Sequence, residues 1–469
     1  MLASRHKTGP HRLGSRSFGR VVEIPLLRMP DPAAPFARRG GEDISVEGYL
    51  RDVAALAVLL PDHRYVANLC QDRYRFAVGF AAALCRRQIT LLPPSEAPGL
   101  LAAALAIYDD VYCLTDAPQA VAAPVFRYPP ILTHAAKPIL VPGFAAEQAA
   151  AILFTSGSTG LPQPHVRSWG LLVSSAISAG QELGIAGLPN TALVGAALIG
   201  TVPHQHSYGL ESLILLAWQH ALVLHAERPF YPADICAQLA AAPRPRILIT
   251  TPVHLRALLA GAGSLPPVDL IVSATAPLPR ELAQAAEAGF AAPVHEIFGC
   301  SEVGQLAFRR TLHTEEWTCL EGIALRQEGG ATWAGGPAIP VETQLADVIE
   351  LRDPRHFRLL GRTADLVNIA GKRSSLAYLN AQINAIEGVR DAVFLLGDEP
   401  ASGPARLVAF AVAPTLTVAD ILAALRLRVD PAFLPRPLHL VDRLGRNELG
   451  KLTHETTAQM LAETGALAP

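Results

Sequence analysis

The fold of this chain is decided by one stretch, Ala149-Ala150-Ala151-Ile152-Leu153-Phe154-Thr155-Ser156-Gly157-Ser158-Thr159-Gly160. Its apolar first half predicts a buried strand, and the glycines and hydroxyl residues that follow predict a tight loop at the strand's end. Open α/β sheets bind ligands at that edge. Glycines leave backbone N–H groups accessible and hydroxyls add rotatable donors, so the loop suits phosphate oxygens. A surface turn of similar composition is the alternative.

Strands and helices alternate on both sides of this loop, which predicts a parallel α/β sheet in each half of the chain. Ser168 is expected to cap the helix that follows the loop, and residues 117–142 are expected to be connecting structure. The predicted helices cover residues 44–60, 73–85, 169–183, 210–220, 233–241 and 280–288, and the predicted strands cover 65–69, 88–92, 192–198, 222–225, 246–250 and 270–273.

The last third of the chain changes character. Residues 303–360 lose helical periodicity and carry many glycines, which is typical of a small β-barrel-like unit. Residues after 361 mix strands and helices again. The expected fold class is therefore α/β: a large N-terminal domain over residues 23–361, with two doubly wound α/β subdomains and the β-barrel-like subdomain, followed by a small α+β C-terminal domain over 362–469. The basic segment 1–22 is expected to be a disordered tail.

Composition limits the possible functions. The chain has 469 residues, a net charge of −2, 50% hydrophobic and 17% charged residues, which predicts a compact protein with no nucleic-acid partner. No uninterrupted apolar run reaches the ~18 residues of a membrane span. The six cysteines are scattered and show no metal-like spacing, so we expect reduced thiols and a cytoplasmic location. Only four residues are lysine, and two of them, Lys372 and Lys451, directly follow a glycine near the C-terminus.

Five further motifs follow the opening loop in order. Each combines small residues with one or two groups that can carry chemistry, at the end of a predicted strand or in a loop. They are Pro203-His204-Gln205-His206-Ser207-Tyr208-Gly209, Ser273-Ala274-Thr275-Ala276-Pro277-Leu278, Phe298-Gly299-Cys300-Ser301-Glu302, Asp347 with Gly361-Arg362-Thr363-Ala364-Asp365, and Gly450-Lys451.

With these six motifs in this order, the chain resembles the adenylate-forming superfamily of acyl-CoA synthetases, carrier-protein adenylation domains and luciferases. The resemblance implies ATP and Mg²⁺ as cofactors and a mobile C-terminal domain. It implies that the loop Thr155–Gly160 wraps the β- and γ-phosphates of ATP. The small residues Ser273–Pro277 would leave a slot for adenine, on which Phe298 stacks, with Gly299 and Ser301 in the same site.

The resemblance also assigns the charged residues around the nucleotide. Glu302 would hold Mg²⁺, a cation that prefers carboxylate and phosphate oxygens. Asp347 would bind the ribose, although Leu345-Ala346 replaces the usual Thr-Gly before it. Arg362 would contact ribose or phosphate. The structural alternatives are a solvated surface acid, a loop aspartate and a surface salt bridge, respectively.

The acyl half of the site is implied by the same resemblance. Lys451 would bridge the carboxylate and the α-phosphate during adenylation, and a charge that arrives only in the transition state lowers the barrier selectively. His206 would gate thiol entry at the wall of the acyl pocket, and Tyr208 and Ser212 would line that pocket, where they could bind a ring hydroxyl. Ordinary core roles for His206, Tyr208 and Ser212 remain open.

The C-terminal domain is expected to swing about residues 362–365 between two poses. Lys451 would then leave the site, and Gly371-Lys372-Arg373 would approach it to admit a thiol-bearing arm. Two positions depart from the family pattern: Gln163 stands where the phosphate loop usually has a lysine, and Ala364 stands in the hinge. We therefore expect more of the positive charge at the phosphates to come from Mg²⁺, Arg362 and Lys451.

The expected function is a two-step ligase that adenylates a carboxylic acid and transfers it to a thiol. Residues 68–74 and 91–95 look similar to ligases of aryl-polyene pigment clusters, which load hydroxybenzoate-type acids onto an acyl carrier protein. An aryl- or medium-chain acyl-CoA synthetase that uses CoA is the alternative, and a noncatalytic nucleotide-binding member is an alternative of another class. A P-loop kinase or ATPase is disfavoured because the G-x-x-x-x-G-K-[ST] spacing is missing.

Overall fold

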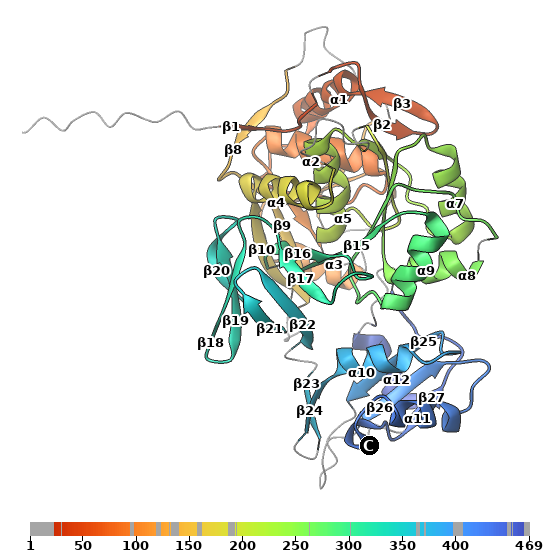
Figure 1. The fold of residues 1–469 in the computed structure, drawn as a ribbon. Helices are drawn as coiled ribbons and strands as arrows, with labels where there is room; N and C mark the ends of the chain where they lie inside the picture. Colours follow the sequence, from red (N-terminus) through yellow and green to blue (C-terminus); the bar gives the residue numbers. More distant parts are fainter. Residues whose placement is uncertain are drawn as a thin grey trace, which may run out of the picture.

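A computed structural model of the chain shows a large α/β body with a smaller lobe below it (Figure 1). The predicted tail 1–22 lies outside the residues that the structure describes. Those residues are 23–29, 31–93, 98–118, 123–130, 132, 140–156, 162–185, 193, 195–261, 263–300, 302–362, 366–369, 372–396, 407–447, 452 and 454–463.

The first sheet has six strands in the order β10-β9-β5-β4-β6-β7. All neighbours are parallel except β10, which returns antiparallel to β9 as a hairpin. The apolar cores place α1 and α2 on one face and α3 on the other. The bounds are α1 (Val46–Leu59), β4 (Tyr65–Asn68), α2 (Arg73–Cys85), β5 (Ile89–Leu92), α3 (Pro98–Leu105), β6 (Val111–Thr115), β7 (Val125–Arg127), β9 (Ala149–Ser156) and β10 (Pro162–Ser168).

The second sheet has eleven strands in the order β21-β22-β17-β16-β15-β14-β13-β11-β12-β2-β3. Its centre is parallel, with α7, α8 and α9 on one face (right in Figure 1) and α4 and α6 on the other. The bounds are β2 (Pro35–Arg39), β3 (Glu42–Ser45), α4 (Trp169–Glu182), β11 (Ala197–Gly200), α5 (Ser207–Gly209), the π-helical segment Leu210–Leu215, α6 (Leu216–His220), β12 (Val223–His225), α7 (Pro232–Ala241), β13 (Arg246–Thr250), α8 (Pro252–Gly261), β14 (Leu270–Ser273), α9 (Arg280–Phe290) and β15 (Val294–Cys300).

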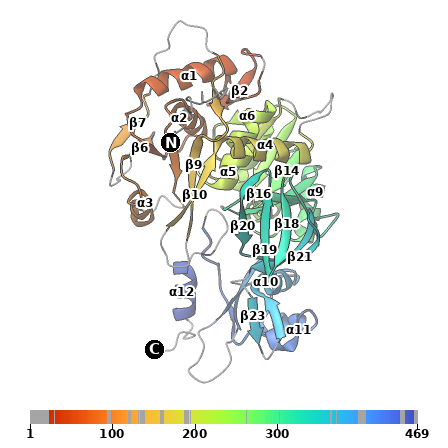
Figure 2. The ribbon, with the colours of Figure 1, turned by 90° about the vertical axis from the view of Figure 1, so that its left-hand side faces the viewer.

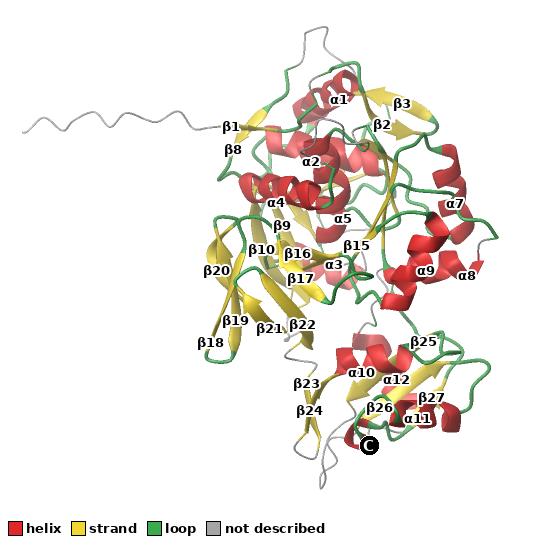
Figure 3. Cartoon of the chain, viewed as in Figure 1, coloured by secondary structure: helices red, strands yellow, loops and turns green. Residues whose placement is uncertain are grey.

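The β-rich region is continuous with the second sheet. Four of its strands, β16, β17, β21 and β22, extend that sheet in antiparallel fashion, and β18, β19 and β20 form a small sheet beside it (Figure 3). One apolar cluster fills the space between the two. The bounds are β16 (Gly304–Arg309), β17 (Glu316–Cys319), β18 (Ala324–Glu328), β19 (Ala331–Gly336), β20 (Ile339–Leu345), β21 (Asp347–Asp353) and β22 (His356–Arg362).

The lower lobe has its own apolar cores, which lie on the two faces of a sheet with the order β25-β26-β27 (Figure 1). A separate hairpin pairs β23 with β24, and β1 pairs with β8 in the large body. The bounds are β1 (Glu23–Pro25), β8 (Gly143–Ala145), β23 (Leu366–Ile369), β24 (Lys372–Ser375), α10 (Leu376–Asn384), β25 (Asp391–Leu396), β26 (Leu407–Val412), α11 (Val418–Arg426), a 3₁₀ turn (Pro431–Phe433), β27 (Leu438–Leu440) and α12 (His454–Glu463).

The α/β fold class is confirmed, and several local predictions need correction. Residues 162–168, for which no element was predicted, form β10, because β9 supplies a partner strand. Within the predicted connection 117–142, β7 extends the first sheet. The first helix begins at Val46, since the Ser45 side chain accepts a hydrogen bond from Gly48 N and Ile44 belongs to β3. No described helix has both the length and the apolar character of a membrane span.

Candidate active site

The predicted motifs follow the carboxyl ends of strands in both sheets. The phosphate loop follows β9 in the first sheet, and the segments around His206, Ser273 and Phe298 follow or end β11, β14 and β15 in the second. Parallel strands bring their carboxyl ends to one edge of a sheet, so the predicted motifs lie at one edge of each sheet. Figure 2 shows the lower lobe beneath the large body.

The phosphate loop itself, residues 157–161, lies outside the described residues. Its stem is described: β9 and β10 pair so that Thr155 lies opposite Gln163 and Ser156 lies opposite Pro162. Gln163, which replaces the family's lysine, is exposed at this stem. The stem thus carries an uncharged amide directly across from the first loop hydroxyl residue.

The predicted adenine loop is held by a buried acid that the motif analysis did not single out. Glu296 on β15 is 2% exposed, and its Oε1 accepts a hydrogen bond from Leu278 N at 2.8 Å. Arg309 and Thr311 bind its other oxygen, with Arg309 Nη2 at 2.7 Å and the Thr311 hydroxyl at 2.8 Å. Inside the loop, Thr275 has a left-handed backbone with φ +79°. A β-branched residue adopts that conformation only at a cost, so the loop stores strain.

Phe298 lies on β15 in an aromatic group, with ring centroids 5.6 Å from Trp317 and 5.9 Å from Phe357. The strand register shifts between Phe298 and Gly299. A Cβ on Gly299 would lie only 2.3 Å from Gly304 O, so this position requires glycine. These contacts fix the position of Phe298, the ring that is predicted to stack on adenine, near the end of β15.

Glu302 is exposed just beyond β15, and Ser301 lies outside the described residues. Burial first, and then Glu302, raise the pKa of the Cys300 thiol to about 12. Burial lowers the pKa of His165 on β10, and the negative charge of Glu302 acts in the opposite direction. Glu302 therefore interacts electrostatically with His165 of the β9–β10 hairpin.

Asp347 and Arg362 are direct partners across two antiparallel strands. Asp347 begins β21 and Arg362 ends β22, and their Cα atoms are paired in the register. Asp347 is 6% exposed. Asp347, predicted at the ribose, and Arg362, predicted at the ribose or a phosphate, thus lie opposite each other at the end of the sheet.

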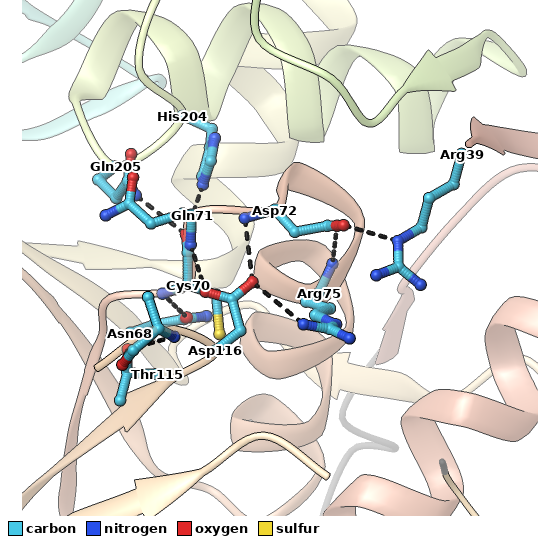
Figure 4. Close-up of polar contacts among 11 residues, drawn as sticks. Arg39, Asn68, Cys70, Gln71, Asp72, Arg75, Thr115, Asp116, His204 and Gln205 are labelled. Carbon is cyan, nitrogen blue, oxygen red and sulfur yellow. Dashed lines mark hydrogen bonds and ion pairs between the residues drawn. The ribbon is translucent and has the colours of Figure 1, made fainter. Parts of the chain in front are cut away.

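A polar network orders the loop after β4 (Figure 4). Asp72 caps α2 by accepting a hydrogen bond from Arg75 N at 3.0 Å, and its other oxygen accepts from Arg39 Nε at 2.6 Å. Asp116 accepts from Gln71 N at 2.8 Å and from Asp72 N at 3.1 Å. Residues 68–74, which carried the narrower family resemblance, therefore have a structural role in this network.

The segment that carries His206 is anchored on this loop. His204 Nε2 donates to Cys70 O at 2.9 Å, and Gln205 Nε2 donates to the same oxygen at 3.0 Å (Figure 4). Burial, and secondarily the charge of Arg73, lower the pKa of His204 well below its ordinary value, so the ring is a neutral donor. His204 is a core residue, and the neighbouring His206 is partly exposed.

The two predicted acyl-pocket residues are both engaged. The Tyr208 hydroxyl lies 2.9 Å from Val272 O and 3.2 Å from Thr250 O. Ser212 is 2% exposed, and its Oγ accepts from Gln305 Nε2 at 2.8 Å. The helix predicted over 210–220 begins as the π-helical segment, a form that is frequent at functional sites.

Glu211 is a second buried acid that sequence reasoning missed. It is 2% exposed and accepts hydrogen bonds from the hydroxyls of Ser175 (2.8 Å) and Ser207 (2.7 Å) and from Gln305 N (3.3 Å). The signal in the sequence was a single acid inside the apolar run 210–217. Such a carboxylate must be buried with partners or interrupt the helix face.

Several predicted residues are not placed by the structure. Lys451, the hinge residues 363–365 and Gly371 lie outside the described residues. Lys372 and Arg373 begin β24, which pairs with β23 so that Lys372 lies opposite Ile369 and Arg373 opposite Asn368. Their proposed approach to the site is therefore not observed.

The comparisons with known proteins bear on this arrangement. The sequence matches the AMP-binding enzyme family over residues 89–342, which include the phosphate loop, the His206 segment, the adenine loop and Glu302. The chain belongs to the AMP-binding enzyme family. It is 31% identical over 303 residues to the 4-coumarate–CoA ligase of Rhodobacter capsulatus, covering 64% of this chain and 73% of that protein.

Other members of the AMP-binding family extend this result. The chain is 27% identical over 355 residues to the probable 2-succinylbenzoate–CoA ligase of Mycobacterium tuberculosis, covering 67% of this chain and 85% of that protein. The o-succinylbenzoate CoA synthetase of Bacillus subtilis, solved with its acyl-adenylate intermediate, shares the fold with a TM-score of 0.77 over 92% of this chain and 97% of that chain, at 17% identity. This member of the family is therefore an AMP-forming ligase.

Proposed function

We propose that this AMP-binding enzyme adenylates an aromatic, hydroxybenzoate-like carboxylic acid and transfers the acyl group to the phosphopantetheine thiol of an acyl carrier protein. The first step forms acyl-AMP and releases pyrophosphate, and in the second step the thiol sulfur displaces AMP. The observation that carries the proposal is an electrostatic interaction between the two sheets. Glu302 of the second sheet lies within electrostatic reach of the β9–β10 hairpin of the first.

The residues present suit the nucleotide. Thr155 and Ser156 end β9 just before the glycine- and hydroxyl-rich sequence 157–160, whose composition suits phosphate oxygens. The exposed Glu302 carboxylate is a hard oxygen ligand of the kind Mg²⁺ takes, and the ion when bound would neutralise phosphate charge. Asp347 and Arg362, paired at the end of the sheet, would hold the ribose.

Lys451 is proposed to act in adenylation alone. A lysine is a compact charge that can meet both the carboxylate and the α-phosphate as they react. The C-terminal domain, proposed to cover residues 362–469, would turn about 362–365 and replace Lys451 by Gly371-Lys372-Arg373 for thiol transfer. Lys451→Ala should lower the adenylation rate by about 10² to 10³ while acyl transfer from preformed acyl-adenylate continues. Equal loss of both half-reactions would refute this division.

The first test of the function is acid-dependent exchange of labelled pyrophosphate into ATP, measured with benzoic, hydroxybenzoic, cinnamic and medium-chain acids. Exchange with an aromatic acid and none with an aliphatic one supports the substrate class. No exchange with any acid, together with measurable ATP binding, would favour the noncatalytic alternative.

The thiol acceptor has a second candidate, coenzyme A. The two relatives described above carry the name CoA ligase, which favours CoA, whereas residues 68–74 and 91–95 resemble ligases that use a carrier protein. Thioester formation should be compared on holo carrier protein and on CoA with the same acid. A cytoplasmic location is proposed with either acceptor, since all six cysteines are free thiols.

A further inference from the structure

A small pocket with several polar lining residues lies between α4, the π-helical segment and β16. It adjoins the proposed acyl site, because Glu211 lines it and Ser212 is the next residue. Most of its polar groups are uncharged. Its polar lining consists of Arg167, Ser174, Ser175, Ser178, Glu211, Gln305 and Glu321.

Gln305 is one of the residues that line this pocket. The residue is 5% exposed, and its Nε2 donates to Ser212 Oγ at 2.8 Å. Its Oε1 has no hydrogen-bond partner among the described residues. A buried carbonyl oxygen without a donor is costly, and a ligand that brings a donor recovers that cost.

Tyr208 is the less suitable acceptor for a substrate hydroxyl. Its own hydroxyl faces two backbone carbonyls, Thr250 O and Val272 O, at 3.2 and 2.9 Å. A phenol donates one hydrogen, and that hydrogen is committed to the backbone. Gln305 therefore offers the free acceptor on this side of the site.

The charges around the pocket favour a neutral donor. A Cβ on Gly304 would lie 3.2 Å from Arg167 Nη2 and 3.1 and 3.2 Å from the two Glu211 oxygens, so these opposite charges flank the same glycine. The Glu211 oxygens already accept from Ser175, Ser207 and Gln305 N. Glu321 is an exposed acid among the lining residues. A hydroxyl fits this surrounding better than an ammonium or a second carboxylate, which would need its own counter-charge.

We propose that Gln305 determines specificity: its Oε1 accepts a hydrogen bond from a ring hydroxyl of the acid, so the enzyme selects hydroxylated over methoxylated or unsubstituted aromatic acids. The inference rests on the proposed function and deepens it. Gln305 supports this role because it lies opposite Gly299 on the neighbouring strand, beside the predicted nucleotide edge.

The experiment measures binding and turnover on the full chain. Calorimetry is carried out with acyl-sulfamoyl-adenosine analogues of para-hydroxybenzoate, para-methoxybenzoate and benzoate, and pyrophosphate exchange with the three free acids gives kcat and KM. The wild type should prefer the hydroxyl over the methoxyl compound by about tenfold or more. Gln305→Met should reduce that preference to about threefold or less, mainly through the KM of the hydroxylated acid. The loss of the Gln305–Ser212 hydrogen bond affects all three acids alike, so the ratio between them is the readout.

Gln219 provides a matched control. It is also a buried glutamine, 4% exposed, whose Nε2 donates to Leu26 O and whose Oε1 has no partner among the described residues, but it does not line this pocket. Gln219→Met should keep the hydroxyl preference. Equal binding of hydroxyl and methoxyl compounds by the wild type, or a preference that survives Gln305→Met, overturns the inference and leaves the adenylation proposal standing. Failure of all three analogues to bind the wild type overturns both.

Discussion

Two buried glutamates, one bonded to the predicted adenine loop and one beside the predicted acyl pocket, have different surroundings. Glu296 and Glu211 are each 2% exposed. Glu296, behind the adenine loop, is bonded to Arg309, Thr311 and Leu278 N, so its charge is balanced by a partner at 2.7 Å. Glu211, behind the proposed acyl wall, takes hydroxyl and amide donors and adjoins a pocket. We call the first region closed, because its own contacts satisfy the carboxylate, and the second region open, because a small pocket adjoins it.

The largest expected effect comes from opening the closed region. Glu296→Ala leaves Arg309 without its buried partner and frees Leu278 N, so we expect the free energy of unfolding to fall by about 3–5 kcal/mol. The KM for ATP should rise more than the KM for the acid, because the freed backbone belongs to the adenine loop. Urea unfolding and initial-rate kinetics measure the two effects.

The control for this variant is Glu287→Ala. Glu287 pairs with Arg310 at 3.0 Å, but that arginine side chain is 33% exposed, so solvent screens the pair. Its loss should cost clearly less stability than Glu296→Ala. A similar loss in both variants would mean that Glu296 contributes only as an ordinary ion pair.

Acid pH should loosen both regions through histidines. His295 precedes Glu296 on β15. His254 on α8 is linked through the Thr201 hydroxyl to Thr250, whose carbonyl accepts from the Tyr208 hydroxyl. Burial lowers the pKa of each histidine to about 4 from an ordinary 6.5. The native rings are neutral, so their stabilisation is complete above about pH 6.5 and is lost as the pH falls toward 4, by up to about 1.4 kcal/mol per pH unit for each ring. Urea unfolding at about pH 7 and about pH 5 measures this.

The histidine prediction also separates the two regions. His254→Gln and His295→Gln should each flatten the pH dependence by roughly one histidine's share. If one variant leaves the pH dependence unchanged, the histidine that it replaces does not have a lowered pKa in the folded protein. The burial of that ring in the structure would then be contradicted.

A substitution of Glu211, in the open region, should lower the free energy of unfolding less than Glu296→Ala does. Glu211→Gln keeps the shape but turns one acceptor oxygen into an NH₂ group that faces a hydroxyl donor or Gln305 N, and we expect a loss of about 1–2 kcal/mol. The KM for the acid should rise while the KM for ATP stays within about twofold. Steady-state kinetics with both substrates checks this split, and a larger change for ATP would contradict it.

Features that depend on neighbouring residues were predicted from the sequence, and features that depend on residues distant in the chain were not. Local signals gave the strands at 246–250 and 270–273 and the helix capped by Ser168, since apolar runs and caps act within a few residues. The two acids were missed because their partners are distant: Ser175 lies 36 residues from Glu211 and Gln305 lies 94 away. The roles predicted for Lys451 and the phosphate loop stay predictions. β10 was not predicted because its sequence contains two prolines, and such a run forms a strand only where a partner such as β9 pairs with it.

The smallest effect tests whether the closed region stores strain. Thr275 is held at φ +79° between Ser273, which ends β14, and Leu278, which Glu296 binds. Thr275→Gly removes the Cβ that disfavours this conformation, and the relief should exceed the added freedom of the unfolded chain, giving a net gain of about 1 kcal/mol. Ala276→Gly, beside it and without a positive φ, should instead lose about 0.5–1 kcal/mol. If both glycines destabilise equally, Thr275 is not strained, and Glu296 holds a relaxed loop.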